Sequence, residues 1–155
     1  MRGRSLLVAA ALLAGGRTAT AQTQDQAVAA LRDLAQAVRA EDYERAAALM
    51  QAPPPPAARA QEMKRLLFAQ EISEPGIEVL AREGRWGKLD AVVPPTEAAR
   101  IAKRAGVALD RCYGLVLRGA RGLFYWTGEA FKILRVESIG RLVPERVASE
   151  KQTTP

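Results

Sequence analysis

The first half of the chain places hydrophobic residues at helical spacing. From Thr23 to Ala40, apolar side chains recur every three or four residues, which predicts a helix with one buried face. A second helix is expected after Asp42, and a third over about Ala57 to Ile72. Four successive prolines, Pro53–Pro56, separate these two helices and predict a stiff connector, because proline lacks an amide donor and fixes its own backbone angle.

The second half changes to the shorter period of strands. "IEVLA" and "WGKLDAVV" predict two short strands joined by a hairpin at "REGR", and Thr96–Ala105 predicts a helix that Gly106 ends. Three further strands are expected over about Cys112–Arg118, Leu123–Trp126 and Ala130–Glu137. Helices first and antiparallel strands later predict an α+β fold. In this fold, N-terminal helices pack on a curved antiparallel sheet of about five strands, with one helix inserted between strands.

Half of the chain's eight aromatic residues fall between Arg121 and Gly140. In a strand with one wet face, apolar and polar residues alternate, but "LFYW" does not alternate. Leu123 and Tyr125 project to one side of this strand, and Phe124 and Trp126 to the other. The pattern therefore predicts a strand that is covered on both sides, or one whose second side lines a concavity or meets a partner.

The following strand repeats this pattern, with Phe131 and Ile133 on one face and Leu134 and Val136 on the other. We expect Phe124 and Trp126 to lie against the helices. The concave side of the sheet is then expected to carry the aromatic residues Tyr113, Tyr125 and Phe131.

The first 21 residues have the order of a secretory signal peptide. Arg2 and Arg4 precede an apolar run from Leu6 to Ala14, and Ala19-Thr20-Ala21 forms a small-x-small cleavage site. The apolar run is too short for a membrane span, which needs about 20 residues. We predict an exported protein, periplasmic or secreted, with a signal peptide at 1–21, a single domain at 22–143 and a flexible tail at 144–155.

Removal of the predicted signal peptide also lowers the net charge of the chain. The whole chain carries a net charge of +6, but Arg2, Arg4 and Arg17 belong to the predicted signal peptide, so the mature chain carries only +3. Its remaining basic residues are interspersed with acidic ones, as on an ordinary solvated surface. No nucleic-acid partner is therefore expected.

Residue types exclude several chemistries. The chain has no histidine, the usual neutral-pH base and the commonest metal ligand, and Cys112 is its one cysteine. No metal-ligand spacing or phosphate-binding glycine loop is present, so we expect neither a metal nor a cofactor. The strand-like "DRCYGLVL" predicts that Cys112 is a buried, inert side chain rather than a reactive thiol or an intermolecular bridge.

Two segments carry a family resemblance. The opening "AVRAEDYERAAALM" and the closing hairpin "FYWTGEAFKILRV" resemble the helical pair and the curved sheet of the nuclear-transport-factor-2-like (ketosteroid-isomerase-like) superfamily. The likeness covers about Thr23 to Leu142, and it departs from the family where the helix at Thr96–Ala105 interrupts the strands. It implies a cone-shaped fold, which hosts isomerases, dehydratases and exported binding or accessory domains.

Our first hypothesis is an exported, non-catalytic binding or accessory domain that holds an apolar small ligand or a protein partner on its curved sheet. A small cofactor-free pocket enzyme of isomerase or dehydratase type, using a carboxylate and a tyrosine, is the alternative. An envelope structural subunit, or a homodimer that pairs through the sheet, is the third. No catalytic residue is assigned. The candidate ligand-binding residues are Trp86, Asp110, Tyr113, Tyr125 and Phe131.

Overall fold

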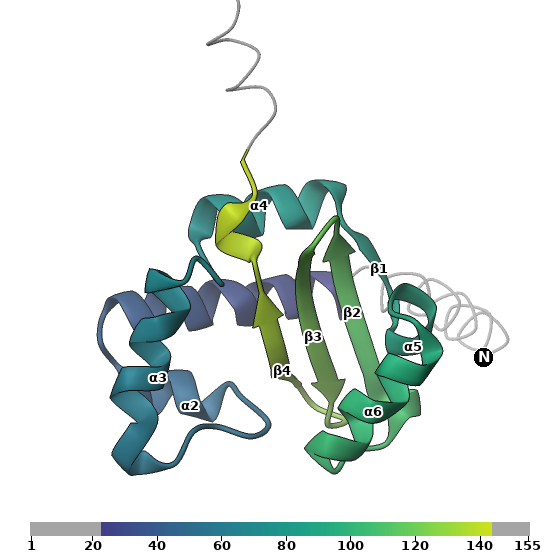
Figure 1. Cartoon of the computed structure of the whole chain (residues 1–155), viewed down its shortest axis with the longest axis horizontal. Coiled ribbons are helices and arrows are strands. Elements are labelled where there is room, and N and C mark those ends of the chain that lie inside the picture. The colour runs from purple at the N-terminus through teal and green to yellow at the C-terminus, as the bar shows by residue number, and fades with distance from the viewer. Residues whose placement is uncertain (1–22, 144–155) are drawn as a thin grey trace, which may run out of the picture.

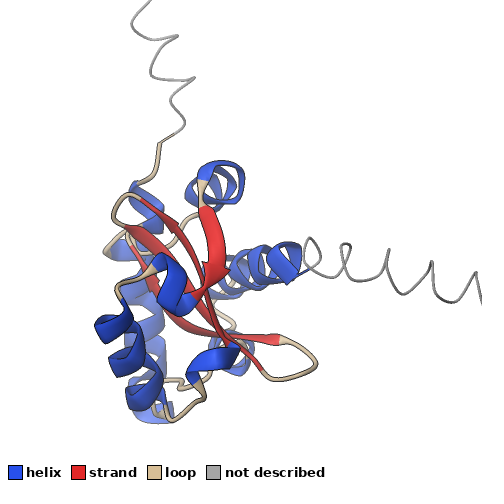
Figure 2. Cartoon of the chain, turned by 90° about the vertical axis from the view of Figure 1, so that its right-hand side faces the viewer, coloured by secondary structure: helices blue, strands red, loops and turns tan. Residues whose placement is uncertain are grey.

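The computed structural model describes residues 23–143. The predicted signal peptide at 1–21 and the predicted tail at 144–155 lie outside this range. Helices cover both sides of a twisted antiparallel sheet (Figures 1 and 2). In chain order the elements are a helix at 23–39, α2 (Tyr43–Ala48), α3 (Pro56–Phe68), α4 (Glu74–Glu83), β1 (Arg85–Lys88), α5 (Leu89–Val92), α6 (Pro95–Ala105), the 3₁₀ turn η1 (Leu109–Arg111), β2 (Cys112–Leu117), β3 (Ala120–Trp126), β4 (Phe131–Glu137) and the 3₁₀ turn η2 (Ile139–Arg141).

The α+β class is confirmed, and a helix lies at each of the three positions predicted in the first half, although the third ends at Phe68 and not at about Ile72. The Asp42 side chain caps α2 by accepting a hydrogen bond from the Arg45 amide at 3.2 Å. The helix α3 begins at Pro56, the last of the four prolines, where the missing amide costs nothing because the first amides of a helix have no partner within it.

The described sheet has four strands rather than the expected five. Its order is β1-β2-β3-β4, with every neighbouring pair antiparallel. "IEVLA" is helical and belongs to α4, which starts where the Ser73 hydroxyl accepts from the Gly76 amide at 3.1 Å. A short apolar run fits a buried helix as well as a strand, and Pro75 stands in the first turn of this helix, where proline is tolerated.

Two helices, not one, lie between β1 and β2 along the chain. "WGKLDAVV" divides at Lys88, where β1 ends and the single turn α5 begins. The longer α6 ends as expected at Gly106, whose left-handed φ of 70° forms the C-cap. The segment between the two strands therefore builds a small helical layer over one face of the sheet (Figure 1).

Two hydrophobic cores result, one on each face of the sheet. The larger core packs the 23–39 helix, α3 and α4 against the side chains of Leu115, Phe124 and Ile133. The smaller core packs α5 and α6 against Cys112 and Leu123. The double covering predicted from "LFYW" is confirmed, because Leu123 and Phe124 are both fully buried on opposite faces.

The strand register corrects the expected grouping of the aromatic residues. Trp126 pairs with Phe131, so these two side chains lie on one face, together with Phe124 and Tyr113. Tyr125 pairs with Cys112 and Lys132 and therefore lies on the opposite face, away from Tyr113 and Phe131. Alternation within one strand is readable from sequence, but the relation between two strands depends on the turn between them.

A bulge changes the face of one further residue. Phe124 pairs with Ile133 and Leu123 pairs with Arg135, so Leu134 is the extra residue in β4. Val136 thereby returns to the face of Ile133 and joins the larger core, while Leu134 packs on the smaller one. The predicted grouping of Leu134 with Val136 is wrong for this reason.

Candidate functional site

The aromatic residues that the sequence singled out form a packed cluster. Phe131 lies at its centre, with ring centroids 5.7 Å from Trp86, 5.6 Å from Tyr113, 5.8 Å from Phe124 and 4.9 Å from Trp126. Trp86 stacks on Tyr113 at 5.4 Å with an angle of 9° between the rings. Phe124 is fully buried and Phe131 is 5% exposed, so the protein's own side chains occupy this part of the sheet. Such pairs stabilise a core beyond their buried area.

The cluster contains three of the five predicted ligand-binding residues, namely Trp86, Tyr113 and Phe131. Tyr125 is half-buried on the opposite face, next to the smaller core. Asp110 lies in η1 with its side chain exposed, and its backbone carbonyl accepts a hydrogen bond from the Lys88 ammonium. The same ammonium lies 4.6 Å above the Tyr113 ring. The structure thus separates Tyr125 from the other aromatic candidates and leaves the Asp110 carboxylate at the surface.

Cys112 is fully buried, as expected. Burial raises the pKa of its thiol from 9.0 to about 11; the nearby Asp110 charge adds to this effect and Lys88 opposes it. The sulfur lies 3.4 Å from the Ala108 carbonyl oxygen, to which the thiol donates. A neutral, enclosed thiol is a poor nucleophile because the thiolate is the reactive form.

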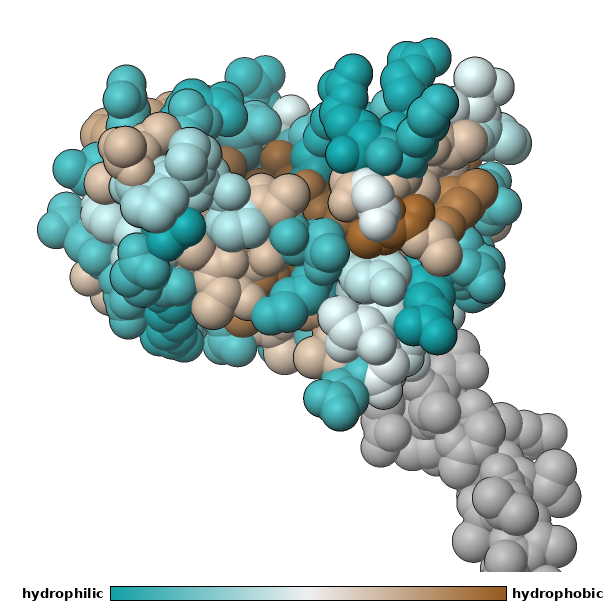
Figure 3. Space-filling view, turned by 90° about the horizontal axis from the view of Figure 1, so that it is seen from below, coloured by the Kyte–Doolittle hydropathy of each residue, from teal (hydrophilic) through white to brown (hydrophobic). Residues whose placement is uncertain are grey.

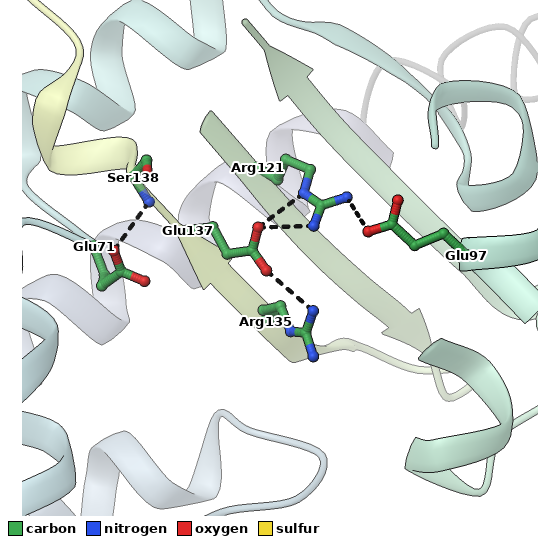
Figure 4. Close-up of polar contacts among 6 residues, drawn as sticks. All are labelled: Glu71, Glu97, Arg121, Arg135, Glu137 and Ser138. Carbon is green, nitrogen blue, oxygen red and sulfur yellow. Dashed lines mark hydrogen bonds and ion pairs between the residues drawn. The ribbon is translucent and has the colours of Figure 1, made fainter. Parts of the chain in front are cut away.

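On the face of α5 and α6, Arg121 of β3 is the centre of an ion network (Figure 4). Its Nε and Nη2 donate to Glu137 Oε2 at 3.0 and 2.8 Å, and its Nη1 donates to Glu97 Oε1 at 2.8 Å. Arg135 Nη1 donates to the other Glu137 oxygen at 3.1 Å. Since Glu97 is in the first turn of α6 and Glu137 ends β4, the network ties this helix to two strands.

The network fixes the charge of its central arginine. Burial alone lowers the pKa of Arg121, whose side chain is 18% exposed. Hydrogen bonds to Glu137 and Glu97, together with their charges, outweigh that effect and raise the pKa above its ordinary value. Arg121 is therefore a permanent cation that is matched by its two neighbouring carboxylates, which indicates a structural role.

Beside this network, two adjoining hollows form what we call the arginine groove. Their volumes are about 120 and 160 Å³, and both are lined by Ile101, Arg104 and Arg135. Viewed from below, a hollow with apolar residues along its floor separates the part formed by α2 and α3 from the part formed by α6 (Figure 3). The remaining lining residues are Ala52, Glu97, Arg100, Ala105 and Leu134.

Two arginines of this groove are left for other partners. Arg100 and Arg104 are exposed on α6, and neither forms an ion pair within residues 23–143. Arg135 is bound on one side by Glu137, which holds it beside them. The groove therefore combines free positive charge with an apolar floor, an arrangement that suits carboxylates carried by a partly apolar chain.

Arg100 and Arg104 were not among the candidate residues that the sequence pattern singled out. The sequence did contain one sign of a site at this helix. Arg100 and Arg104 are four residues apart, a spacing at which like charges disfavour an isolated helix, and both lie near the buried Ile101. The contribution of Arg135 and Ala52 could not be foreseen, since they reach the groove from distant parts of the chain.

Comparisons with known proteins do not assign this chain to a family. The chain matches no protein-family model, no curated protein and no solved structure. Across residues 23–143, no helix is both long and apolar enough to cross a membrane. The same residues contain no group of three or more Cys, Asp or Glu side chains placed to hold a metal ion. Fold and site together define an α+β domain with a packed aromatic face and a basic surface groove.

Proposed function

We propose that this protein is an exported, non-catalytic binding module that holds an extended acidic segment of a protein partner in the arginine groove. The observation that carries the proposal is the pair Arg100 and Arg104, exposed and without ion pairs in the described chain, above a floor that contains Ile101 and Leu134. Guanidinium groups bind carboxylates through two parallel hydrogen bonds, which gives both affinity and orientation.

The size of the groove favours a peptide over a drug-sized molecule. Its two hollows, of about 120 and 160 Å³, are each smaller than the roughly 300–1,000 Å³ that typically encloses a small ligand. A chain laid along the surface needs no such enclosure. The aromatic face, where an apolar ligand was first expected, supports this choice because Phe124 and Phe131 already fill it.

The charge of the groove favours an acidic partner. Glu97 and Glu137 neutralise Arg121, and Glu137 also holds Arg135, so neither carboxylate is paired with Arg100 or Arg104. Exposed ion pairs contribute only about 0.2–1 kcal/mol each, so the apolar floor must supply part of the affinity. The preferred segment therefore alternates carboxylates with apolar side chains.

Export and family membership belong to the same proposal. The order of the first 21 residues, in which Arg2 and Arg4 precede an apolar run and Ala19-Thr20-Ala21 follows it, supports export. The order of helices followed by an antiparallel meander supports the resemblance to the nuclear-transport-factor-2-like superfamily. The enzyme alternative has less support, because Tyr113 is stacked on Trp86 and the Asp110 side chain is exposed.

The test uses a fluorescein-labelled peptide of alternating Asp and Leu residues, with alternating Asn and Leu as the uncharged control. Binding is measured by fluorescence anisotropy with the protein recovered after expression of the full-length gene. We expect the acidic peptide to bind and the double substitution Arg100→Gln/Arg104→Gln to weaken it about tenfold or more.

The control removes one positive charge elsewhere, and its effect is compared with that of Arg100→Gln or Arg104→Gln alone. Arg82 is exposed on α4 and does not line the groove, so Arg82→Gln should leave the affinity within about twofold. Equal binding of the acidic and uncharged peptides would refute the proposal. So would an equal loss of affinity in the Arg82 variant, which would indicate attraction by net charge alone.

A further inference from the structure

We infer that the protein forms a weak symmetric dimer with a second copy of itself through the end of α3, independently of the arginine groove. The first observation is Phe68, the last residue of α3, which is 85% exposed. Among the large apolar side chains of residues 23–143, Val143 is the other exposed one. An exposed aromatic ring beside a hollow is a feature of interaction surfaces.

A hollow of about 570 Å³, which we call the α3 groove, lies next to this ring. Its apolar part is formed by Val38, Tyr43 and Leu67, and Phe68 lies on its rim. The volume is in the range that encloses organic groups the size of a side chain or larger. The Tyr43 hydroxyl beneath this site is buried and has no hydrogen-bond partner among the described residues.

The polar rim of the α3 groove carries both signs of charge. Glu41 and Lys64 line it, and neither makes an ion pair within the described residues. Arg39, the third charged residue of the rim, is paired with Glu74 at 3.0 Å. One free acid and one free base around an apolar floor form a surface that complements its own copy.

These features select a second copy as the occupant. A two-fold axis places the same patch on both sides of a contact, so each subunit must supply both the projecting group and the hollow that receives it. Here Phe68 of each copy enters the α3 groove of the other, and Glu41 of each copy faces Lys64 of the other. The expected sheet-mediated dimer has less support, because the Ile133 amide and carbonyl on the edge strand β4 are bonded to Leu49 and Gln51.

The contact is small. Two Phe68 side chains bury about 300–500 Å² in total, whereas a specific interface buries about 1,200 Å² or more. The dimer should therefore exchange with monomer in the micromolar range or above. It would give a binding module two arginine grooves on one particle.

The first experiment is analytical ultracentrifugation of the protein recovered after expression of the full-length gene, over a concentration series up to about 1 mM. We expect a concentration-dependent mass and an association constant that falls at least tenfold in Phe68→Ala. Gln61→Ala, an exposed change on the same helix outside the groove, should leave the association unchanged. A constant monomer mass over the series, or equal association in Phe68→Ala, would overturn the inference.

The second experiment separates self-association from every other use of the surface. Glu41→Lys and Lys64→Glu should each weaken the dimer, because each variant places like charges opposite one another across the two-fold axis. An equal mixture of the two variants restores both attractive pairs, so the heterodimer should form more readily than either homodimer. If the mixture associates no better than the separate variants, the proposed pairing of Glu41 with Lys64 is wrong.

Discussion

The two faces of the sheet are covered by different helices and packed with different kinds of side chain. One face carries the rings of Trp86, Tyr113, Phe124 and Phe131, which contact one another and are covered by the long N-terminal helices. The other face is covered by α5 and α6, whose buried side chains are aliphatic, and an ion network centred on Arg121 closes its margin. The face richest in aromatic residues is thus the most completely filled, while the smaller core leaves charged groups and a groove at its edge.

The largest expected effect compares two neighbours on opposite faces. Phe124→Ala should lower the free energy of unfolding by about 3–5 kcal/mol, because it removes a fully buried ring from the larger core. Leu123→Ala should cost about 2–3 kcal/mol, since it removes fewer atoms from a smaller core that relaxes more easily. Urea unfolding measures both, with the m-value compared to detect departures from two-state behaviour. A larger loss of unfolding free energy for Leu123→Ala would show that the smaller core contributes more to stability at this strand than the larger core does.

The ion network gives the second test. Arg121→Met keeps the aliphatic stem but leaves Glu97 and Glu137 without their main partner, and we expect a loss of about 2–3 kcal/mol. Arg111→Met changes an exposed arginine in η1 and should alter stability by no more than about 0.5 kcal/mol. Equal effects of the two substitutions would show that the network does not hold α6 to the sheet.

The stability of the protein at alkaline pH tests whether water is excluded from the smaller core. The pKa of Cys112 is raised from 9.0 to about 11 in the folded protein, so the unfolded chain loses the thiol proton first. The stabilising contribution of the neutral thiol is complete below about pH 9 and is lost as pH rises toward 11, by about 2 kcal/mol at about pH 10.5.

The control for this measurement is Cys112→Ala, whose stability should fall less steeply over the same alkaline range. The other titrating groups are the same in both proteins, so the difference between the two slopes reports Cys112. Parallel slopes would mean that water reaches the thiol in the folded state. Rapid labelling of the native thiol, at the rate seen in denaturant, would mean the same and would contradict its predicted inertness.

Sequence patterns predicted what depends on neighbouring residues. The helical period of residues 23–39, the helix after Asp42 and the Gly106 end signal are all local, and all three are confirmed. "IEVLA" was misassigned because an apolar run of five residues carries no period that separates a buried strand from a buried helix.

Properties that depend on distant residues could not be predicted in the same way. The face of Phe131 relative to Tyr125 depends on the turn that pairs Trp126 with Phe131, and the position of Val136 depends on a bulge. The aromatic residues were singled out from composition, which identifies bulky groups but does not distinguish a filled core from an open site. The arginine groove arises only when α6, β4 and the segment around Ala52 come together.

The central claim is that binding takes place at the arginine groove and not at the aromatic face. The most direct measurement is two-dimensional NMR of the ¹⁵N-labelled protein during addition of the alternating Asp–Leu peptide. We predict saturable shifts of the backbone amides of Ile101, Arg104, Leu134 and Arg135, while the indole signals of Trp86 and Trp126 stay in place. Shifts concentrated at the two indoles and at Phe131 would place the ligand on the aromatic face instead, and that result would contradict the account.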